Sequence, residues 1–260
     1  MAKSNPTGVF QVMKSCNCNF YCGTSNVVLP VPNKGHYPPE YQDKSRLNYY
    51  ASIFNSVEVN SSFYKIPMGR TIEKWTKDVP EDFRFTFKLW RGITHNKYLN
   101  YEEADIKRFM QAMDMAGGKK GCLLIQLPGS ITFQYLPKLK KILDNIKVRG
   151  TVADWKLAIE FRHNSWYRDE TYQALESYTA AVVMHDMPKS RTPLIDMEAP
   201  FVYLRFHGEK GDYRGTYTDE FLQEYAACIK DWISEGKTVF AYFNNTMGQA
   251  VHNALALITF

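Results

Sequence analysis

Residues 202–207 read Val-Tyr-Leu-Arg-Phe-His, an apolar run that ends in charged and polar side chains. Seven other runs along the chain have the same form, and most are followed by a stretch with apolar residues at helical spacing. The eight runs are Phe20–Thr24, Ser56–Asn60, Arg84–Lys88, Cys122–Gln126, Leu157–Glu160, Ala181–Asp186, Val202–His207 and Val239–Asn244. Buried parallel strands with polar carboxyl ends are typical of one α/β architecture, the closed TIM-like (β/α)8 barrel, whose active sites lie at that face. We therefore predict this fold, with the functional site at the carboxyl ends of the strands.

Two of the connections depart from a regular repeat of strand and helix. Met187–Pro200, after the sixth run, contains three prolines and has no apolar period. Proline interrupts helices, so we expect an extended crossing there and no regular sixth helix. The helix after the second run, around Ile72–Lys77, is expected to be only one or two turns long.

Length and composition limit the class of protein. The 260 residues suit one barrel domain, which we place at residues 20–260, after a disordered or extended segment at residues 1–19. The net charge of +5 favours anionic partners weakly. No apolar run is long enough to span a bilayer and Met1–Lys14 has no apolar core of a signal peptide, so we expect a cytoplasmic protein with no membrane association.

The five cysteines are an odd number, which favours a reducing compartment. Three of them, Cys16, Cys18 and Cys22, have a spacing that matches no standard zinc or iron–sulfur motif. The sequence also has no Walker A, Rossmann glycine or nucleophile-elbow motif. We therefore expect no cofactor.

Pairs of polar residues close five of the runs. Side chains two residues apart point to the same face of a strand, so each pair is expected to face the barrel axis. The pairs are Glu58 with Asn60, Thr86 with Lys88, Glu160 with Arg162, Arg205 with His207, and Tyr242 with Asn244. Carboxylates, cations and a histidine in one site shift each other's pKa values and can perform acid–base chemistry on an anionic substrate.

We accordingly expect an enzyme, a hydrolase, lyase or isomerase, that acts on a small phosphate- or carboxylate-bearing substrate. The expected catalytic residues are Glu58 or Glu160 as base and His207 as acid. The residues expected to bind the substrate are Asn60, Lys88, His95, Arg162, Asp186, Arg205 and Asn244.

Two alternatives concern the same cluster. The carboxylates and cations of the cluster can pair purely to neutralise buried charge. Carboxylates and histidines are also ligands in metal-dependent barrels, but cations in the same mouth oppose a divalent ion. We therefore expect no metal, and we expect phosphate or sulfate to bind more readily than a divalent cation.

Several blocks of the sequence resemble the YecE-like family, known as domain of unknown function seventy-two. These blocks are F-Y-C-G-T-S at 20–25, V-E-V-N-S-S-F-Y at 57–64, I-T-H at 93–95, L-I-Q-L-P at 124–128, A-I-E-F-R-H-N-S-W at 158–166, Y-L-R-F-H-G at 203–208 and Y-F-N-N at 242–245. The resemblance covers nearly the whole chain from Phe20 onward and implies a TIM-like barrel, but it implies no established reaction.

A second function remains open at the level of sequence. The YecE-like family is similar in fold to metal-dependent barrels of the endonuclease IV kind, which is an analogy of fold alone. It makes a nucleic-acid-binding or nucleic-acid-processing protein the alternative to an enzyme for small anions. The aromatic residues expected to stack on bases are Trp90, Tyr98, Trp166 and Tyr213.

Overall fold

A computed structural model describes residues 19–148, 155–193 and 198–260 of the chain. The predicted N-terminal extension, apart from Asn19, lies outside these residues, as do Cys16 and Cys18. Cys22, the third member of the cysteine group, is a free thiol buried in the first strand.

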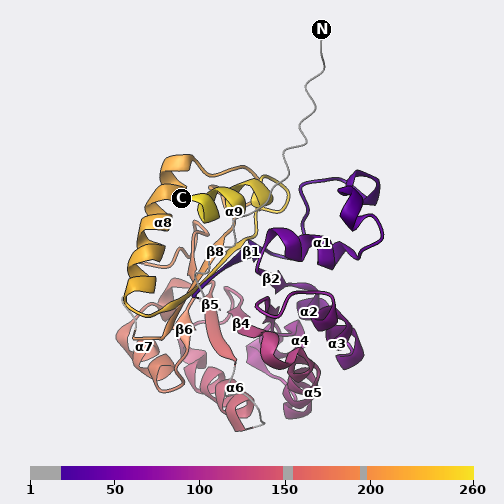
Figure 1. Cartoon of the computed structure of the whole chain (residues 1–260). Helices are drawn as coiled ribbons and strands as arrows, with labels where there is room; N and C mark the ends of the chain where they lie inside the picture. Colours follow the sequence, from indigo (N-terminus) through magenta and orange to yellow (C-terminus); the bar gives the residue numbers. More distant parts are fainter. Residues whose placement is uncertain (1–18, 149–154, 194–197) are drawn as a thin grey trace.

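Within the described residues, nine strands form two sheets in which all neighbours are parallel (Figure 1). One sheet has the order β1-β9-β8-β7 and the other the order β2-β3-β4-β5-β6. The strands are β1 (Phe20–Thr24), β2 (Ser56–Val59), β3 (Arg84–Lys88), β4 (Lys120–Leu127), β5 (Lys156–Phe161), β6 (Ala181–Val182), β7 (Met184–His185), β8 (Phe201–Phe206) and β9 (Thr238–Phe243). The prediction of a parallel α/β fold is confirmed, and each of the eight sequence runs contributes at least one strand.

The sixth run accounts for the ninth strand, because it splits into β6 and β7 around Val183. The Val183 N–H donates to the carbonyl of Ile159 on β5 (2.8 Å). The Thr192 hydroxyl donates to the carbonyl of Val183 (2.8 Å) and accepts from the N–H of His185 (3.1 Å). The Thr192 side chain thus makes hydrogen bonds that a neighbouring strand would otherwise make. At this point the chain passes from the sheet that contains β6 to the sheet that contains β7.

The first strands of the two sheets approach each other closely. A single parallel bridge joins Ser25 to Glu58, and the N–H of Asn26 donates to the carbonyl of Glu58 (2.7 Å). A Cβ atom at Gly23 would lie 2.0 Å from the carbonyl oxygen of Ser56, so only glycine permits this approach. The ladders therefore define two open parallel sheets that are joined at β1 and β2 by one bridge.

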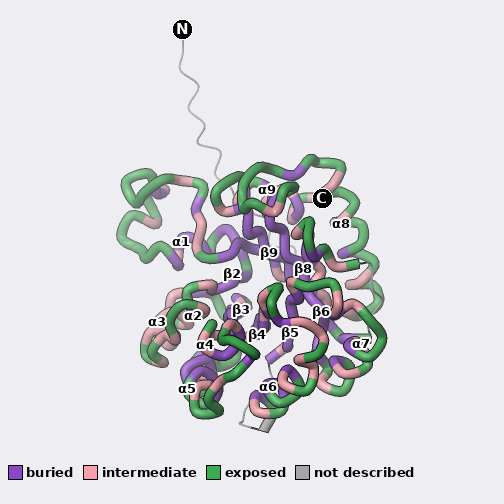
Figure 2. The backbone as a smooth tube through the Cα atoms, turned by 180° about the vertical axis from the view of Figure 1, so that it is seen from behind, coloured by how far each residue is buried: buried purple, intermediate pink, exposed green. Residues whose placement is uncertain are grey.

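Helices surround the strands on the outside (Figures 1 and 2). They are α1 (Arg46–Ile53), α2 (Ser61–Tyr64), α3 (Gly69–Lys77), α4 (Arg91–Thr94), α5 (Glu103–Met113), α6 (Leu136–Val148), α7 (Asp169–Glu176), α8 (Asp219–Ser234) and α9 (Ala250–Thr259). The helix predicted at Ile72–Lys77 is longer than expected, since α3 has nine residues. Residues 187–193 and 198–200 contain no helix, as predicted, although residues 188–190 form a turn and residues 194–197 of the predicted crossing lie outside the described residues. None of the helices that the structure describes is long and apolar enough to cross a membrane.

Side chains on the inner faces of the two sheets meet in a separate small core. This core includes Leu124, Val183, Tyr203 and Tyr242, apart from the larger core between the strands and the helices. The Tyr242 hydroxyl on β9 lies 2.5 Å from Ser56 Oγ on β2. The inner faces of the two sheets are thus in direct contact, and polar residues extend from this core toward the carboxyl ends of the strands.

We expect Tyr242→Phe to lower the free energy of unfolding by about 1–2 kcal/mol, because the hydroxyl also lies 2.8 Å from Thr86 Oγ1 and all three groups are buried. Urea denaturation of the wild type and the variant measures this loss. Tyr64→Phe is the matched control, since Tyr64 is 68% exposed and should change stability little. An equal effect of both variants would contradict the inter-sheet contact.

Candidate functional site

Charged side chains from three strands meet at the carboxyl ends of β2, β5 and β8. Arg205 Nη2 lies 2.9 Å from Glu58 Oε1, and Arg205 Nη1 lies 2.9 Å from Glu160 Oε2. Both carboxylates are completely buried, and Arg205 is 1% exposed. Because β2 and β8 belong to different sheets, Arg205 links the sheets through charge as well as through packing.

Both oxygens of Glu58 already have strong donors. The Ser25 hydroxyl donates to Oε1 (2.5 Å), the Tyr203 hydroxyl donates to Oε2 (2.5 Å), and Arg205 donates to both. Burial alone would raise the pKa of Glu58, but the Arg205 charge and these hydrogen bonds hold it below the ordinary value. Glu58 is therefore a fixed anion that positions Arg205.

Glu160 is shared between two guanidinium groups. Arg162 Nε donates to Oε1 (2.5 Å), and Arg205 Nη1 donates to Oε2. Burial opposes ionisation, but the charges of Arg162 and Arg205 keep the pKa of Glu160 well below its ordinary value. The Arg162 side chain is 12% exposed, whereas those of Arg205 and the two glutamates are at most 1% exposed, so Arg162 lies at the accessible edge of this group.

The hydrogen bonds of His207 define its tautomer. Nε2 lies 3.0 Å from Arg162 Nη2 and 3.1 Å from Arg205 Nη1, and both of these groups can only donate. Nδ1 must then carry the proton, which it donates to Asp186 Oδ1 (3.1 Å). Burial and the Arg205 charge lower the pKa of His207 to about 4, although Asp186 acts in the opposite direction. His207 is therefore neutral at pH 7, and Asp186 is held in place on its other oxygen by the Tyr217 hydroxyl.

Lys88, at the end of β3, has an unusual environment for a buried cation. Its ammonium donates to Gln126 Oε1 (2.7 Å) and lies 4.2 Å from the centre of the Phe63 ring. No carboxylate of the described residues lies within ion-pair distance of it. Burial and the Arg205 charge lower the pKa of Lys88 to about 7. This position therefore has a cationic group whose charge no described carboxylate balances at close range.

His95 extends the polar chain that begins at Lys88. Gln126 Nε2 lies 3.4 Å from His95 Nε2, and His95 Nδ1 lies 2.8 Å from the Thr94 hydroxyl. Burial and the Lys88 charge lower the pKa of His95 to about 4, so this ring is also neutral at pH 7.

Most of the residues that the sequence singles out are in mutual contact. The connected residues are Glu58, Glu160, Arg162, Asp186, Arg205 and His207, while Lys88 and His95 form the neighbouring chain through Gln126. Asn60 and Asn244 share no hydrogen bond with either group; the side-chain oxygen of Asn60 is buried without a partner among the described residues. We call the six connected residues the charge network.

Four participants were not among the predicted site residues. Ser25 and Tyr203 bind Glu58, Tyr217 binds Asp186, and Gln126 binds Lys88. The alternation that selected Arg205 and His207 also places Tyr203 on the inner face, so this residue had a detectable signal. Tyr217 lies in a loop beyond β8, where alternation gives no information.

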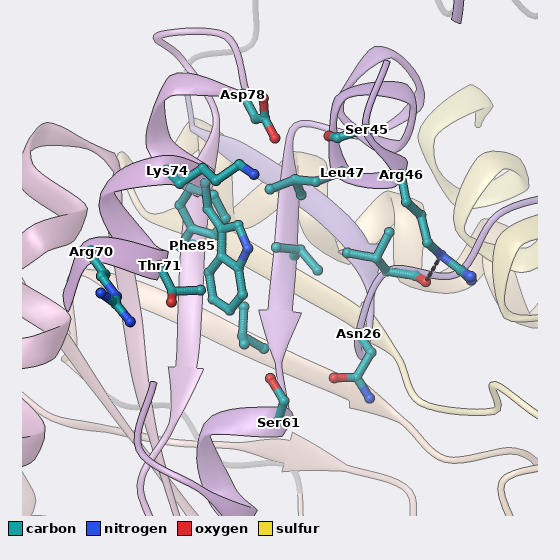
Figure 3. Close-up of a pocket in the computed structure, with 14 residues that line it drawn as sticks. Asn26, Ser45, Arg46, Leu47, Ser61, Arg70, Thr71, Lys74, Asp78 and Phe85 are labelled. Carbon is teal, nitrogen blue, oxygen red and sulfur yellow. Dashed lines mark hydrogen bonds between the residues drawn. The ribbon is translucent and has the colours of Figure 1, made fainter. Parts of the chain in front are cut away.

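A pocket of about 760 Å³ lies elsewhere, on the outer side of β2 between α1 and α3 (Figure 3). Its floor includes Val57 and Val59, whose side chains alternate with Glu58 along β2 and therefore point away from the charge network. The pocket and the charge network thus occupy opposite faces of one strand.

The structure bears on two of the alternative functions. Trp166 is completely buried, and its indole N–H donates to the carbonyl of Ile131, so the prediction that this ring stacks on nucleic-acid bases is wrong. Tyr98 and Tyr213 are exposed and Trp90 is half-buried. The described residues contain no group of three or more histidines, cysteines or carboxylates placed to hold a metal ion.

Fold and site together define a parallel α/β protein with a buried charge network at the carboxyl ends of its strands. The chain belongs to the family described as "Protein of unknown function DUF72", which matches residues 22–260. The resemblance to the YecE-like family is therefore confirmed.

Individual relatives support this assignment. The UPF0759 protein YunF of Bacillus subtilis (strain 168) is 26% identical over 244 residues, which are 82% of this chain and 84% of that protein. The UPF0759 protein YecE of Escherichia coli (strain K12) is 28% identical over 121 residues, which are 46% of this chain and 43% of that protein.

Two crystal structures of DUF72 family proteins are similar over most of the fold. The protein from Enterococcus faecalis V583 has a TM-score of 0.73 and 25% identity, and the match covers 92% of this chain and 96% of that chain. The protein from Thermotoga maritima MSB8 has a TM-score of 0.72 and 26% identity, with 92% and 98% covered.

Proposed function

We propose that this protein is an enzyme with an acid–base site at the carboxyl ends of its strands and that its substrate is a small molecule bearing phosphate or carboxylate. The observation that carries the proposal is Lys88, a buried cation with no carboxylate partner among the described residues. A buried cation is costly unless a counterion compensates it. A bound anionic substrate would supply that counterion.

The site belongs, in this proposal, to a closed (β/α)8 barrel that forms a single domain over residues 20–260. Three features support closure: the bridge from Ser25 to Glu58, the passage of the chain between sheets at Val183, and the contact of Tyr242 with Ser56 across the interior. In such a barrel the carboxyl ends of the strands form one mouth, which is where barrel enzymes bind substrates.

Arg162 and Lys88 are the two cations that a substrate anion would meet. Arg205 is not expected to bind the substrate, because its N–H groups already donate to Glu58, Glu160 and His207. Arg162 is more exposed and binds Glu160 mainly through Nε, so part of its guanidinium can turn toward an anion.

Movement of Arg162 toward a substrate would change His207. The Nε2 lone pair of His207 would lose one of its two guanidinium donors, and the departing charge is one of the causes that lower the pKa of this ring. His207 would then accept a proton from the substrate at Nε2, with Arg205 Nη1 keeping its bond to Glu160 Oε2 and giving up the one to Nε2, while Asp186 holds Nδ1–H. The tautomer thus favours His207 as a general base, in place of the acid role expected from the sequence. Glu58 and Glu160 would stabilise the resulting imidazolium by their charge.

A ligand-stabilisation screen tests the proposal and does not require the reaction to be known. Thermal unfolding is measured with phosphorylated and carboxylated metabolites, nucleotides and divalent metals, because any ligand of the folded state raises its apparent stability. We expect stabilisation by anions that Arg162→Met and Lys88→Met each weaken. Lys107→Met, which removes an equal charge from the exposed surface of α5, is the control. Stabilisation by Zn²⁺ or Mn²⁺ alone, lost in Glu160→Gln, would instead support a metal-dependent site.

The pKa of Lys88 predicts how anion binding depends on pH. Lys88 is charged below pH 7 and neutral above it, so binding should be strongest below pH 7 and weaken as the pH rises. Sulfate is the suitable probe because its own charge is constant in this range. We expect its Kd to increase about tenfold from pH 6 to pH 8 if the bound form requires the ammonium. Calorimetric titration measures this change, and the dependence should vanish in Lys88→Met. A pH-independent Kd in the wild type that is also unchanged in Lys88→Met would exclude Lys88 as the anion ligand.

The nucleic-acid alternative has less support. Tyr98 and Tyr213 are exposed and could stack on bases, but Trp166 is buried and could not. Fluorescence anisotropy with a labelled single-stranded oligonucleotide tests it, since nucleic-acid binding would fall steeply with added salt and depend on these two tyrosines.

A further inference from the structure

On the outer surface, α1 and α3 are separated by a pocket, whereas several other helices pack directly against one another. Helix α3 packs against α5, α5 against α6, and α8 against α9, but α1 and α3 leave a pocket of about 760 Å³ between them. They are joined at one end, where the Asn48 side chain on α1 donates to the carbonyl of Asp78 after α3 (2.8 Å). A pocket of this volume is in the range of small-molecule sites.

The inner part of this pocket is apolar. Leu47 from α1, Val57 and Val59 from β2, Trp75 from α3 and Phe85 from β3 line it. These side chains come from four different elements of the rigid framework, so the apolar surface does not depend on one mobile loop. A hydrocarbon or aromatic body would gain free energy by displacing water from it.

The outer part of the pocket is cationic. Arg46, Arg70 and Lys74 line it, with Asp78 as the single carboxylate. Figure 3 shows Lys74 extending from α3 in the direction of α1, with Arg70 and Arg46 at opposite sides of the pocket. Arg46 is held by a hydrogen bond from Nε to the carbonyl of Val27 (3.2 Å).

Arg70 and Lys74 are a like-charge pair on α3. They are four residues apart, which places them on one face of the helix and makes them repel each other. No carboxylate of the described residues lies within ion-pair distance of either one, whereas Lys77 on the same helix pairs with Glu73 at 2.8 Å. An anion between the pair would relieve this repulsion.

We propose that the pocket between α1 and α3 binds a small amphipathic anion, with its apolar body on Val57, Trp75 and Phe85 and its single anionic head between Arg70 and Lys74. This site is separate from the charge network and does not depend on the proposed reaction, because it uses the outer face of β2. The ligand class is a carboxylate, sulfonate or phosphate that carries an aliphatic or aromatic body of moderate size.

Binding of 8-anilinonaphthalene-1-sulfonate, an amphipathic anion whose fluorescence rises in apolar surroundings, tests this inference. We expect one dye per chain, displaced by decanoate and much less by uncharged decanol. The double variant Arg70→Glu/Lys74→Glu should weaken dye and decanoate at least tenfold. Lys107→Glu/Lys140→Glu changes the net charge equally on the exposed surfaces of α5 and α6 and should change Kd less than twofold.

A second variant tests the apolar half of the pocket. Thr71, which lies beside Arg70 and lines the pocket, is replaced by phenylalanine to fill the space, and we expect dye binding to be lost. Each variant must unfold cooperatively with heat, because a loosened core also binds this dye. The inference is wrong if the charge-reversed and filled proteins bind the dye like the wild type, or if decanol competes as well as decanoate.

Discussion

Replacing Arg205 by leucine is expected to lower the free energy of unfolding by about 3–5 kcal/mol, because two buried carboxylates would lose their shared cation. Arg205 is 1% exposed and contacts Glu58 and Glu160 at 2.9 Å each, so water cannot replace the lost charge without opening the interior. The same network depresses the pKa values of both glutamates, and the variant should therefore take up protons at a higher pH than the wild type.

Urea denaturation at pH 7 measures the loss for Arg205→Leu. The matched control is Arg108→Leu, which removes an exposed arginine paired with Asp105 at 2.9 Å. Exposed pairs contribute roughly 0–1 kcal/mol, so this variant should be nearly as stable as the wild type. A loss below about 1 kcal/mol for Arg205→Leu would show that Glu58 and Glu160 do not depend on it.

The strands were predictable from the sequence because the signal for each one is local. The residue pattern of a run such as Val202–His207 predicts both that the strand is buried and on which of its faces the polar side chains lie. The break at Val183 was not predictable in this way. It depends on the Thr192 hydroxyl, nine residues further along the chain, which takes the hydrogen bond of the Val183 carbonyl.

The candidate site was predictable only as a set of residues. Alternation along β5 and β8 brought Glu160, Arg162, Arg205 and His207 to one face, and the structure joins them by hydrogen bonds. Their roles depend on which hydrogen-bond donor faces which acceptor, and a local sequence pattern does not predict this. The two guanidinium groups that face His207 Nε2 come from different strands, and they determine which ring nitrogen carries the proton.

The pocket between α1 and α3 could not be predicted from local sequence patterns. Its volume arises because two helices fail to pack, and helix packing depends on crossing angles and side-chain volumes across the interface. The spacing of Arg70 and Lys74 on α3 is visible in the sequence, but a charged helix face is ordinarily just solvated. The two cations suggest a binding site only in combination with the apolar floor of the pocket, which is visible in the structure and not in the sequence.

His207 is expected to make the folded state lose stability as the pH falls from 7 to 5. Its pKa is about 4 in the folded protein, against an ordinary value of 6.5, because burial and the Arg205 charge oppose the imidazolium. Between these values the unfolded chain binds a proton that the folded protein does not, so the free energy of unfolding decreases with falling pH. The contribution of this one residue is about 2 kcal/mol between pH 7 and pH 5.

Urea denaturation of the wild type and of His207→Gln at pH 7 and pH 5 isolates this contribution, because the other titrating groups are common to both proteins. The loss between the two pH values should be smaller by about 2 kcal/mol in the variant, even though the variant is less stable at pH 7. His252→Gln, which replaces an exposed histidine on α9, should retain the full pH dependence of the wild type. Equal slopes for the wild type and His207→Gln would mean that His207 is protonated in the folded protein at pH 5. Nε2 would then carry a proton at pH 5 and could not accept from Arg162 and Arg205 at that pH, so the depressed pKa attributed to burial and the Arg205 charge would be wrong.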